Sequence, residues 1–285
     1  MDFLLWFTGI SVLIIGGSMI YRSSKSRREY LVYAVVNRIR LPVTEDIVMN
    51  IDRRVWNRFA GFGLGWIASL LFLIPFFVKN PALVPSGVAG YAVGSIAIAV
   101  GTASAALVAV RQFAEPGPDA SRVARARSHS LFDYVHPGWV WAAVTAAGVA
   151  TAAGATLLLG SRRPDADIGL PLPAVVSLAA IALIGVPVVA LLCRALLAVP
   201  QPASSELELQ WDDALRASAL RDLWIASIAL STAALVTAAS WLVGPAPIEV
   251  YAVCVIGYLP IVLTALPASR RTNRRLWPLP ERATH

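Results

Sequence analysis

Three side chains that could bind a metal ion lie within eight residues of one another: His129, Asp133 and His136. Imidazole and carboxylate groups at short spacings are common ligands of zinc. Pro137 follows directly, however, and neither a cysteine nor a second acid lies close by in the sequence. The set is therefore incomplete, and we expect the protein to hold no metal and no other cofactor.

Serines in the apolar segments are the remaining candidates for chemistry. Ser227, Ser231 and Ser240 would need a neighbouring base to become nucleophiles, and no histidine lies within these segments. Their hydroxyls are better explained as donors to backbone carbonyls of the same or a neighbouring helix. No P-loop, HExxH or glycine-rich dinucleotide motif occurs either. We therefore expect no catalytic residues, and an intramembrane enzyme is the least favoured class of function.

The overall composition explains why chemistry-bearing residues are so few. Of the 285 residues, 57% are hydrophobic and only 14% are charged, whereas soluble domains carry about a quarter charged residues. Several stretches of twenty or more residues contain no Asp, Glu, Lys or Arg. This composition excludes a soluble enzyme, a nucleic-acid-binding domain and a disordered chain, and it predicts a helical protein whose main partner is the lipid bilayer.

Seven apolar runs are long enough to cross a bilayer core about 30 Å thick as helices. The predicted fold is accordingly all-α, a polytopic transmembrane helical bundle in one integral membrane domain, 1–285. The runs are 3–21, 59–78, 87–110, 139–160, 172–199, 223–243 and 250–268.

The distribution of basic residues predicts the orientation of this bundle. Twenty of the 24 Lys and Arg residues lie in the segments 22–58, 111–138, 200–222 and 269–285, and Arg194 lies at the same end of the fifth span. Only Lys79, Arg162 and Arg163 lie in the other connections. Because basic loops stay in the cytoplasm, the N-terminus is expected outside and the C-terminus inside. An even number of spans would destroy this segregation. The predicted location is the plasma membrane.

Two of the cytoplasmic segments have the pattern of amphipathic helices. Thr44 can cap a helix in which Ile47, Ile51 and Val55 recur every four residues, and this helix runs into the second span. In 206–222, after Ser204 or Ser205, the apolar stripe is Leu207, Trp211 and Leu215, and Asp212, Asp213, Arg216, Arg221 and Asp222 cover the rest. Such helices can lie on the membrane, bind a cytoplasmic protein through 45–58 and 206–222, or pack on each other.

Small residues predict where helices approach closely. Gly61 and Gly65 form one GxxxG pair, and Gly90 and Gly94 form another on a face that also contains Gly101. Such faces allow two helix backbones to come into contact. The second and third spans are therefore expected to pack on each other, or on another subunit in a homo-oligomer.

Two prolines predict helix kinks near the middle of the membrane. Pro187 lies in the fifth span and Pro260 in the seventh, each shortly after a glycine. Interrupted helices often flank the substrate site of a transporter, but they also occur in passive bundles. Arg194, toward the end of the fifth span, is expected to reach the interface with its side chain rather than to serve as a counter-ion.

Three short segments carry a resemblance: Leu41 to Glu45, Asp133 to Val135 and Asp212 to Arg216. Together with the Ala-, Val- and Arg-rich composition, they are similar to uncharacterised multi-spanning membrane proteins of high-GC actinobacteria. The resemblance implies a plasma membrane protein and no particular activity.

Three functions are compatible with these features of the sequence. The favoured one is a non-catalytic accessory or permease-like membrane component that works with a cytoplasmic partner, because the external connections are short and the span interiors carry few charges. The second is a stand-alone carrier or flippase for an uncharged or apolar solute, which would use the kinks at Pro187 and Pro260. The third is the intramembrane enzyme. No nucleic-acid partner is expected, since the net charge of +7 is explained by the cytoplasmic loops.

Overall fold

The computed structural model describes residues 24–79, 87–113, 130–159, 172–199, 201, 203, 205–243 and 277. Within these ranges the chain is all-helical and contains no strand, which confirms the predicted all-α class. The helices are α2 (Lys25–Ile39), α3 (Glu45–Lys79), α4 (Gly87–Phe113), α5 (Leu131–Tyr134), α6 (Pro137–Leu158), α7 (Leu172–Ala198) and α8 (Glu206–Val243). The expected first and seventh spans, with Pro260, lie outside the described residues.

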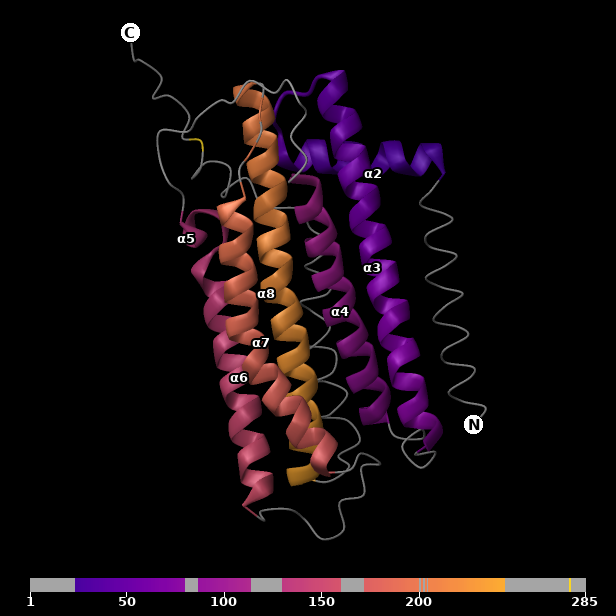
Figure 1. Ribbon diagram of the computed structural model, residues 1–285, viewed down its shortest axis with the longest axis vertical. Coiled ribbons are helices and arrows are strands. Elements are labelled where there is room, and N and C mark those ends of the chain that lie inside the picture. Colours follow the sequence, from indigo (N-terminus) through magenta and orange to yellow (C-terminus); the bar gives the residue numbers. More distant parts are fainter. Residues whose placement is uncertain are drawn as a thin grey trace.

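Three of the described helices are long and apolar enough to cross a membrane: Pro137–Leu158, Leu172–Ala198 and Glu206–Leu242. A shorter apolar stretch, Gly94–Val108, lies within α4. In Figure 1 the long helices run roughly side by side along the long axis of the molecule, so that their ends gather at two opposite ends of the bundle. The protein is therefore a membrane protein with transmembrane helices.

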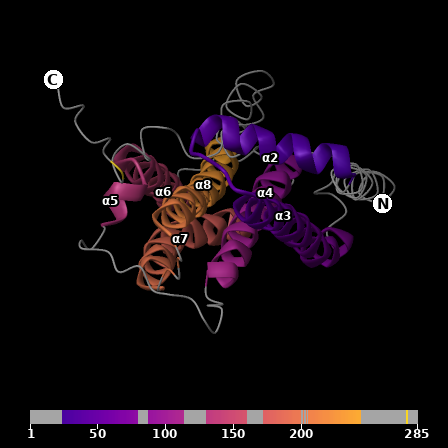
Figure 2. The same ribbon diagram turned by 90° about the horizontal axis from the view of Figure 1, so that it is seen from above.

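Helix α8 forms the centre of the bundle. In its apolar stretch of 18 residues, 78% of the residues are buried within the protein. The corresponding share is 28% in α6 and 28% in α7. Viewed from above, α3 and α4 lie on one side of α8, and α6 and α7 lie on the other (Figure 2). Alanines are frequent on α8, as at Ala226, Ala233 and Ala234, and their small side chains let neighbouring helices approach closely from several sides.

The residues at the starts of α8 and α3 are those typical of helix N-termini. Helix α8 begins at Glu206, and the backbone N–H of Glu208 donates to the hydroxyl of Ser205 at 3.2 Å, the capping bond expected of a serine before a helix. Helix α3 begins directly after Thr44 with Glu45 and Asp46 in its first turn, where acids interact favourably with the helix dipole. Both helices continue without interruption into their apolar halves.

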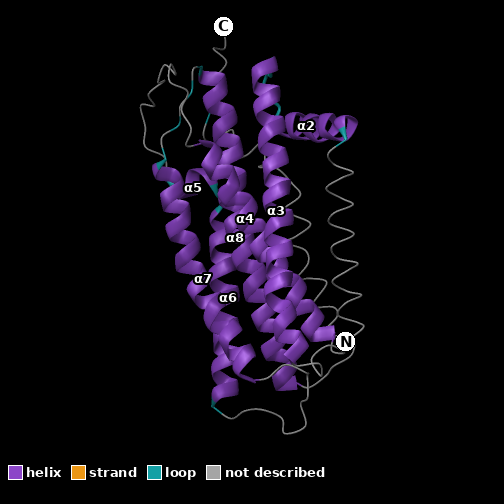
Figure 3. Ribbon diagram, turned by 45° about the vertical axis from the view of Figure 1, so that its right-hand side comes forward, coloured by secondary structure: helices purple, strands orange, loops and turns teal. Residues whose placement is uncertain are grey.

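Helix α2 lies crosswise at one end of the bundle, which we call the α2 end (Figure 3). Its buried residues Val32 and Ile39 form a cluster with Ile47 and Ile51 of α3 and Trp211 of α8. The apolar stripes of 45–58 and 206–222 therefore pack on each other, as in one of the three arrangements that the sequence allowed.

Trp211 also ties α8 to the connection between α2 and α3. Its indole N–H donates to the backbone carbonyl of Pro42 at 2.8 Å. The substitution Trp211→Phe keeps most of the buried ring but removes this donor, so we expect it to lower the free energy of unfolding by about 1 kcal/mol. Thermal unfolding in detergent, with an unchanged helical circular dichroism spectrum as the folding control, measures the effect. An unchanged midpoint would contradict the role of this hydrogen bond.

The glycines of α3 lie at its contact with α4. A Cβ built on Gly61 would lie 3.1 Å from the Cα of Ala105, and one built on Gly65 would lie 2.9 Å from the Cα of Gly101. Side chains larger than hydrogen would therefore push these two helices apart. Of the second predicted pair, Gly90 and Gly94 both lie in α4, and Gly94 is buried.

Candidate functional site

The charged residues of α8 are buried inside the protein and do not form a solvated polar face. The exposed fractions of Asp212, Asp213, Arg216 and Asp222 are 6%, 0%, 2% and 1%. The amphipathic pattern of 206–222 did not show that its charged residues are buried as well. The physical reason is that α3 and other segments cover this face and supply partners for its charges. We call Arg54, Arg58, Asp212, Asp213, Arg216, Arg221 and Asp222 the ionic layer.

Ion pairs in this layer join α3 to α8. Arg54 pairs with Asp212 at 2.7 Å, and Arg58 pairs with Asp222. Because Arg54 and Arg58 are one helical turn apart, both side chains can reach the same neighbouring helix. Asp222 has a second partner, the guanidinium of Arg221 at 3.1 Å. Two arginines thus share one buried carboxylate.

Asp213 connects α8 to three other parts of the chain. Its carboxylate accepts hydrogen bonds from the hydroxyl of Tyr134 at 2.9 Å, from the amide of Gln201 at 2.9 Å and from the indole N–H of Trp277 at 3.0 Å. The ring of Trp277 also packs against the apolar cluster that contains Leu220. Asp213 is therefore the point where α5, the connection before α8 and Trp277 meet.

Arg216 lies deepest among the arginines of the layer. Both of its terminal nitrogens donate to the backbone carbonyl of Val199, at 3.1 and 3.2 Å, at the point where α7 has just ended. One of them also lies 3.9 Å from the carboxylate of Asp212. This arginine satisfies a carbonyl that a helix end would otherwise leave unpaired.

No protein-family model matches this chain, and no curated protein or solved structure matches it either. The chemistry of the ionic layer must therefore be inferred from its own residues. Charged hydrogen bonds and ion pairs here connect α3, α5, the end of α7, α8 and Trp277, at the end of the bundle where α2 lies. Buried networks of this kind hold their helices in one fixed arrangement.

A less buried ion pair lies at the outer edge of the same end. The Nε of Arg28 in α2 donates to Asp52 of α3 at 3.0 Å, and its guanidinium lies 5.8 Å from the ring centre of Trp56. The hydrogen bond with Asp52 raises the pKa of Arg28 above its ordinary value. This contact fastens α2 to α3, but 40% of the Arg28 side chain remains exposed.

The residues that the sequence singled out for metal binding have structural roles. The carboxylate of Asp133 accepts from the backbone N–H of Ser130 at 2.7 Å and completes the capping box of α5. The Nδ1 of His136 accepts from the backbone N–H of Gly138 at 3.0 Å at the start of α6. His129 lies outside the described residues.

The remaining sequence candidates do not come together in one site. Pro187 lies inside α7 with its ring exposed, and Arg194 is exposed near the end of the same helix. Ser231 and Ser240 donate to carbonyls four residues earlier in α8, at 2.8 Å each. The sequence did show a signal for the ionic layer, because 206–222 contains five acids and two arginines directly before an apolar run. It could not show that α3 covers them.

The substitution Tyr134→Phe tests how strongly Asp213 holds α5. It removes one hydrogen bond to a buried carboxylate and leaves the ring in place, so we expect the free energy of unfolding to fall by about 1.5–3 kcal/mol. The exposed Tyr33→Phe in α2 is the matched control and should have no measurable effect. Equal midpoints of thermal unfolding for the two variants would contradict the prediction.

Proposed function

We propose that the protein is a seven-span component of the plasma membrane, with the N-terminus outside and the α2 end in the cytoplasm. The order of the helices supports this orientation. Arg53 and Arg58 lie near the start of α3, Arg111 lies near the end of α4, and Arg194 lies near the end of α7. These helices alternate in direction, so all four positions fall at the α2 end (Figure 1). Basic residues concentrate on the cytoplasmic side of membrane proteins.

We further propose that this component is non-catalytic and that it works by binding a cytoplasmic protein. The observation that carries the proposal is the exposed surface at the first turns of α3 and α8, two helices whose residues Ile47 and Trp211 belong to one apolar cluster. We call Glu45, Asp46, Met49 and Glu206 the acidic tip. All four side chains are exposed, and Met49 is 65% exposed. The tip suits a partner with basic residues around an apolar contact.

The ionic layer supports this proposal because it stiffens the helices that present the tip. A partner binds more tightly to a surface that is already held in its bound conformation, since less conformational entropy is lost on binding. The inner faces of 45–58 and 206–222 belong to one apolar cluster, so only the outer residues of these segments are accessible to a partner.

Affinity purification from the native membrane in mild detergent tests the function. We expect a cytoplasmic protein to co-purify in a fixed stoichiometry with the wild type and to be lost when Glu45, Asp46 and Glu206 are all replaced by lysine. Glu29→Lys, an exposed acid on α2, is the matched control and should retain the partner. Wild-type protein that purifies alone, or a triple variant that keeps the same partner, would refute the proposal.

A further inference from the structure

A small cavity lies where α2, α3, α4 and α8 meet. Its volume is about 50 Å³, and it is partly open to the surface. Polar groups from two helices line it, namely Arg54 and Arg58 of α3 with Ser218 and Asp222 of α8, and Val35 of α2 lies against it. A single water molecule needs only about 10–15 Å³ of such space. The cavity can therefore admit a group larger than water.

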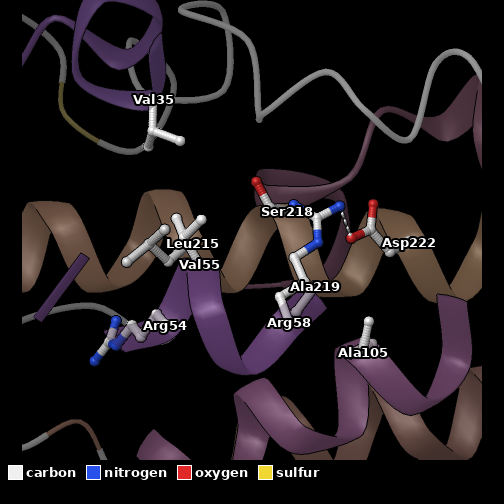
Figure 4. A pocket seen from close by; sticks show the side chains of 10 residues that line it. Val35, Arg54, Val55, Arg58, Ala105, Leu215, Ser218, Ala219 and Asp222 are labelled. Carbon is white, nitrogen blue, oxygen red and sulfur yellow. Dashed lines mark ion pairs between the residues drawn. The ribbon is translucent and has the colours of Figure 1, made fainter. Parts of the chain in front are cut away.

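Arginine dominates the polar lining of this cavity. Figure 4 shows the side chain of Arg58 extending to Asp222, with Ser218 beside it and Arg54 on the far side of Val55 and Leu215. Asp222 is 1% exposed, whereas the Arg58 side chain is 32% exposed. The carboxylate is thus enclosed, and the guanidinium still presents part of its surface outward.

Two arginines of the ionic layer, Arg54 and Arg58, line the cavity itself. Arg58 shares its carboxylate, because Asp222 also pairs with Arg221. Helix α2, which borders the cavity through Val35, has a basic sequence. From Lys25 to Arg40 the chain carries five basic residues and one acid, Glu29. Guanidinium groups are therefore the main cationic donors that the cavity offers to an anionic ligand.

The level of the cavity matches the boundary between polar and apolar parts of the bundle. Arg58 is the last charged residue of α3 before its apolar run, and Asp222 has the same position in α8. At this level of a membrane protein, the nearest abundant anions are the phosphates of lipid headgroups. Guanidinium groups bind phosphate oxygens through paired, charge-assisted hydrogen bonds.

We propose that this cavity binds a phosphate group, in the first place the phosphodiester of an anionic phospholipid in the leaflet at the α2 end. Arg58 and Ser218 donate to the phosphate oxygens, Arg54 contributes charge, and Val35 and Leu215 contact the apolar part of the ligand near the headgroup. A free inorganic phosphate has the same chemistry and would use the same donors. The proposal rests on the membrane location and does not require the cytoplasmic partner.

The test measures thermal unfolding of the purified, delipidated full chain in a neutral detergent. Phosphatidylglycerol, phosphatidylcholine or inorganic phosphate is added to separate samples. We expect phosphatidylglycerol to raise the unfolding midpoint at concentrations at least about tenfold lower than phosphatidylcholine, because the choline charge cancels that of the phosphate. Stabilisation by inorganic phosphate alone, with the same dependence on Arg58, would assign the site to free phosphate. No preference for phosphatidylglycerol and no effect of phosphate would overturn the proposal.

Two variants link the effect to this cavity. Arg58→Lys keeps the charge but loses the paired donors, and Val35→Phe narrows the cavity without touching an ion pair. Each variant should need about tenfold more phosphatidylglycerol than the wild type for the same rise in the unfolding midpoint. Ala34→Phe, an exposed neighbour on the same helix, is the matched control and should respond like the wild type. If Arg58→Lys does not fold, Val35→Phe decides, and a wild-type response of Val35→Phe would refute the assignment.

Discussion

Asp222→Asn should lower the free energy of unfolding by about 3 kcal/mol, and the thermal midpoint should fall with it. The wild-type carboxylate is 1% exposed and compensates two guanidinium groups, those of Arg58 and Arg221. Asparagine has nearly the same shape but no charge, so both cations lose their counter-ion. Removing one partner of a buried ion pair costs about 3–5 kcal/mol. We expect the lower end of this range, since the Arg58 side chain is partly exposed to solvent.

The pair of Arg28 with Asp52 provides the matched control. Asp52→Asn is the same chemical change on the same end of the bundle, but both partners are more exposed, at 40% and 29% of their side chains. Exposed pairs contribute about 0–1 kcal/mol, so the midpoint should change little. The double variant Arg58→Met with Asp222→Asn should recover part of the loss, because one of the unpaired charges is gone. Equal destabilisation by Asp222→Asn and Asp52→Asn would contradict the importance of the ionic layer.

Several elements of the fold could be predicted because their signals are local. A run of apolar residues sets the length of a helix, and the expected segment 172–199 agrees closely with α7 at Leu172–Ala198. The stripe of Ile47 and Ile51 continues in register into the next apolar run, and the structure shows one helix, α3. These features are set by the local sequence and do not depend on which segments pack against the helix.

The burial of the ionic layer could not be predicted, because it depends on contacts between distant parts of the chain. Asp212 and Asp222 have the sequence pattern of a solvated helix face, and only the position of α3 turns them into buried partners of Arg54 and Arg58. Helix α2 was missed for a related reason. It carries apolar or aromatic residues on both faces, since Val32 is buried and the neighbouring Tyr33 is 63% exposed. Its periodicity alone therefore did not define a helix.

The close approach of α3 and α4 leads to the second large effect, which we expect for Gly65→Ala. A Cβ at this position would lie 2.6 Å from the hydroxyl of Ser104 and 2.9 Å from the Cα of Gly101. The first contact can be relieved by a small movement of a side chain, but the second requires the helix backbones to separate. Overpacking of this kind costs about 1–3 kcal/mol, and Gly65→Val should exceed Gly65→Ala.

Gly148 in α6 separates this packing effect from the intrinsic preference of alanine for helices. A Cβ built there meets no other atom within 4 Å, so Gly148→Ala should leave stability unchanged or raise it by up to about 1 kcal/mol. Thermal unfolding in detergent compares the two variants directly. Adding Ser104→Gly to Gly65→Ala removes the 2.6 Å contact and should restore part of the midpoint, while Ser104→Gly alone should not stabilise the protein. If Gly65→Ala were as stable as Gly148→Ala, the two helices would not approach as closely at Gly65 as the backbone distances indicate, and the packing of α3 on α4 would have to depend on other residues.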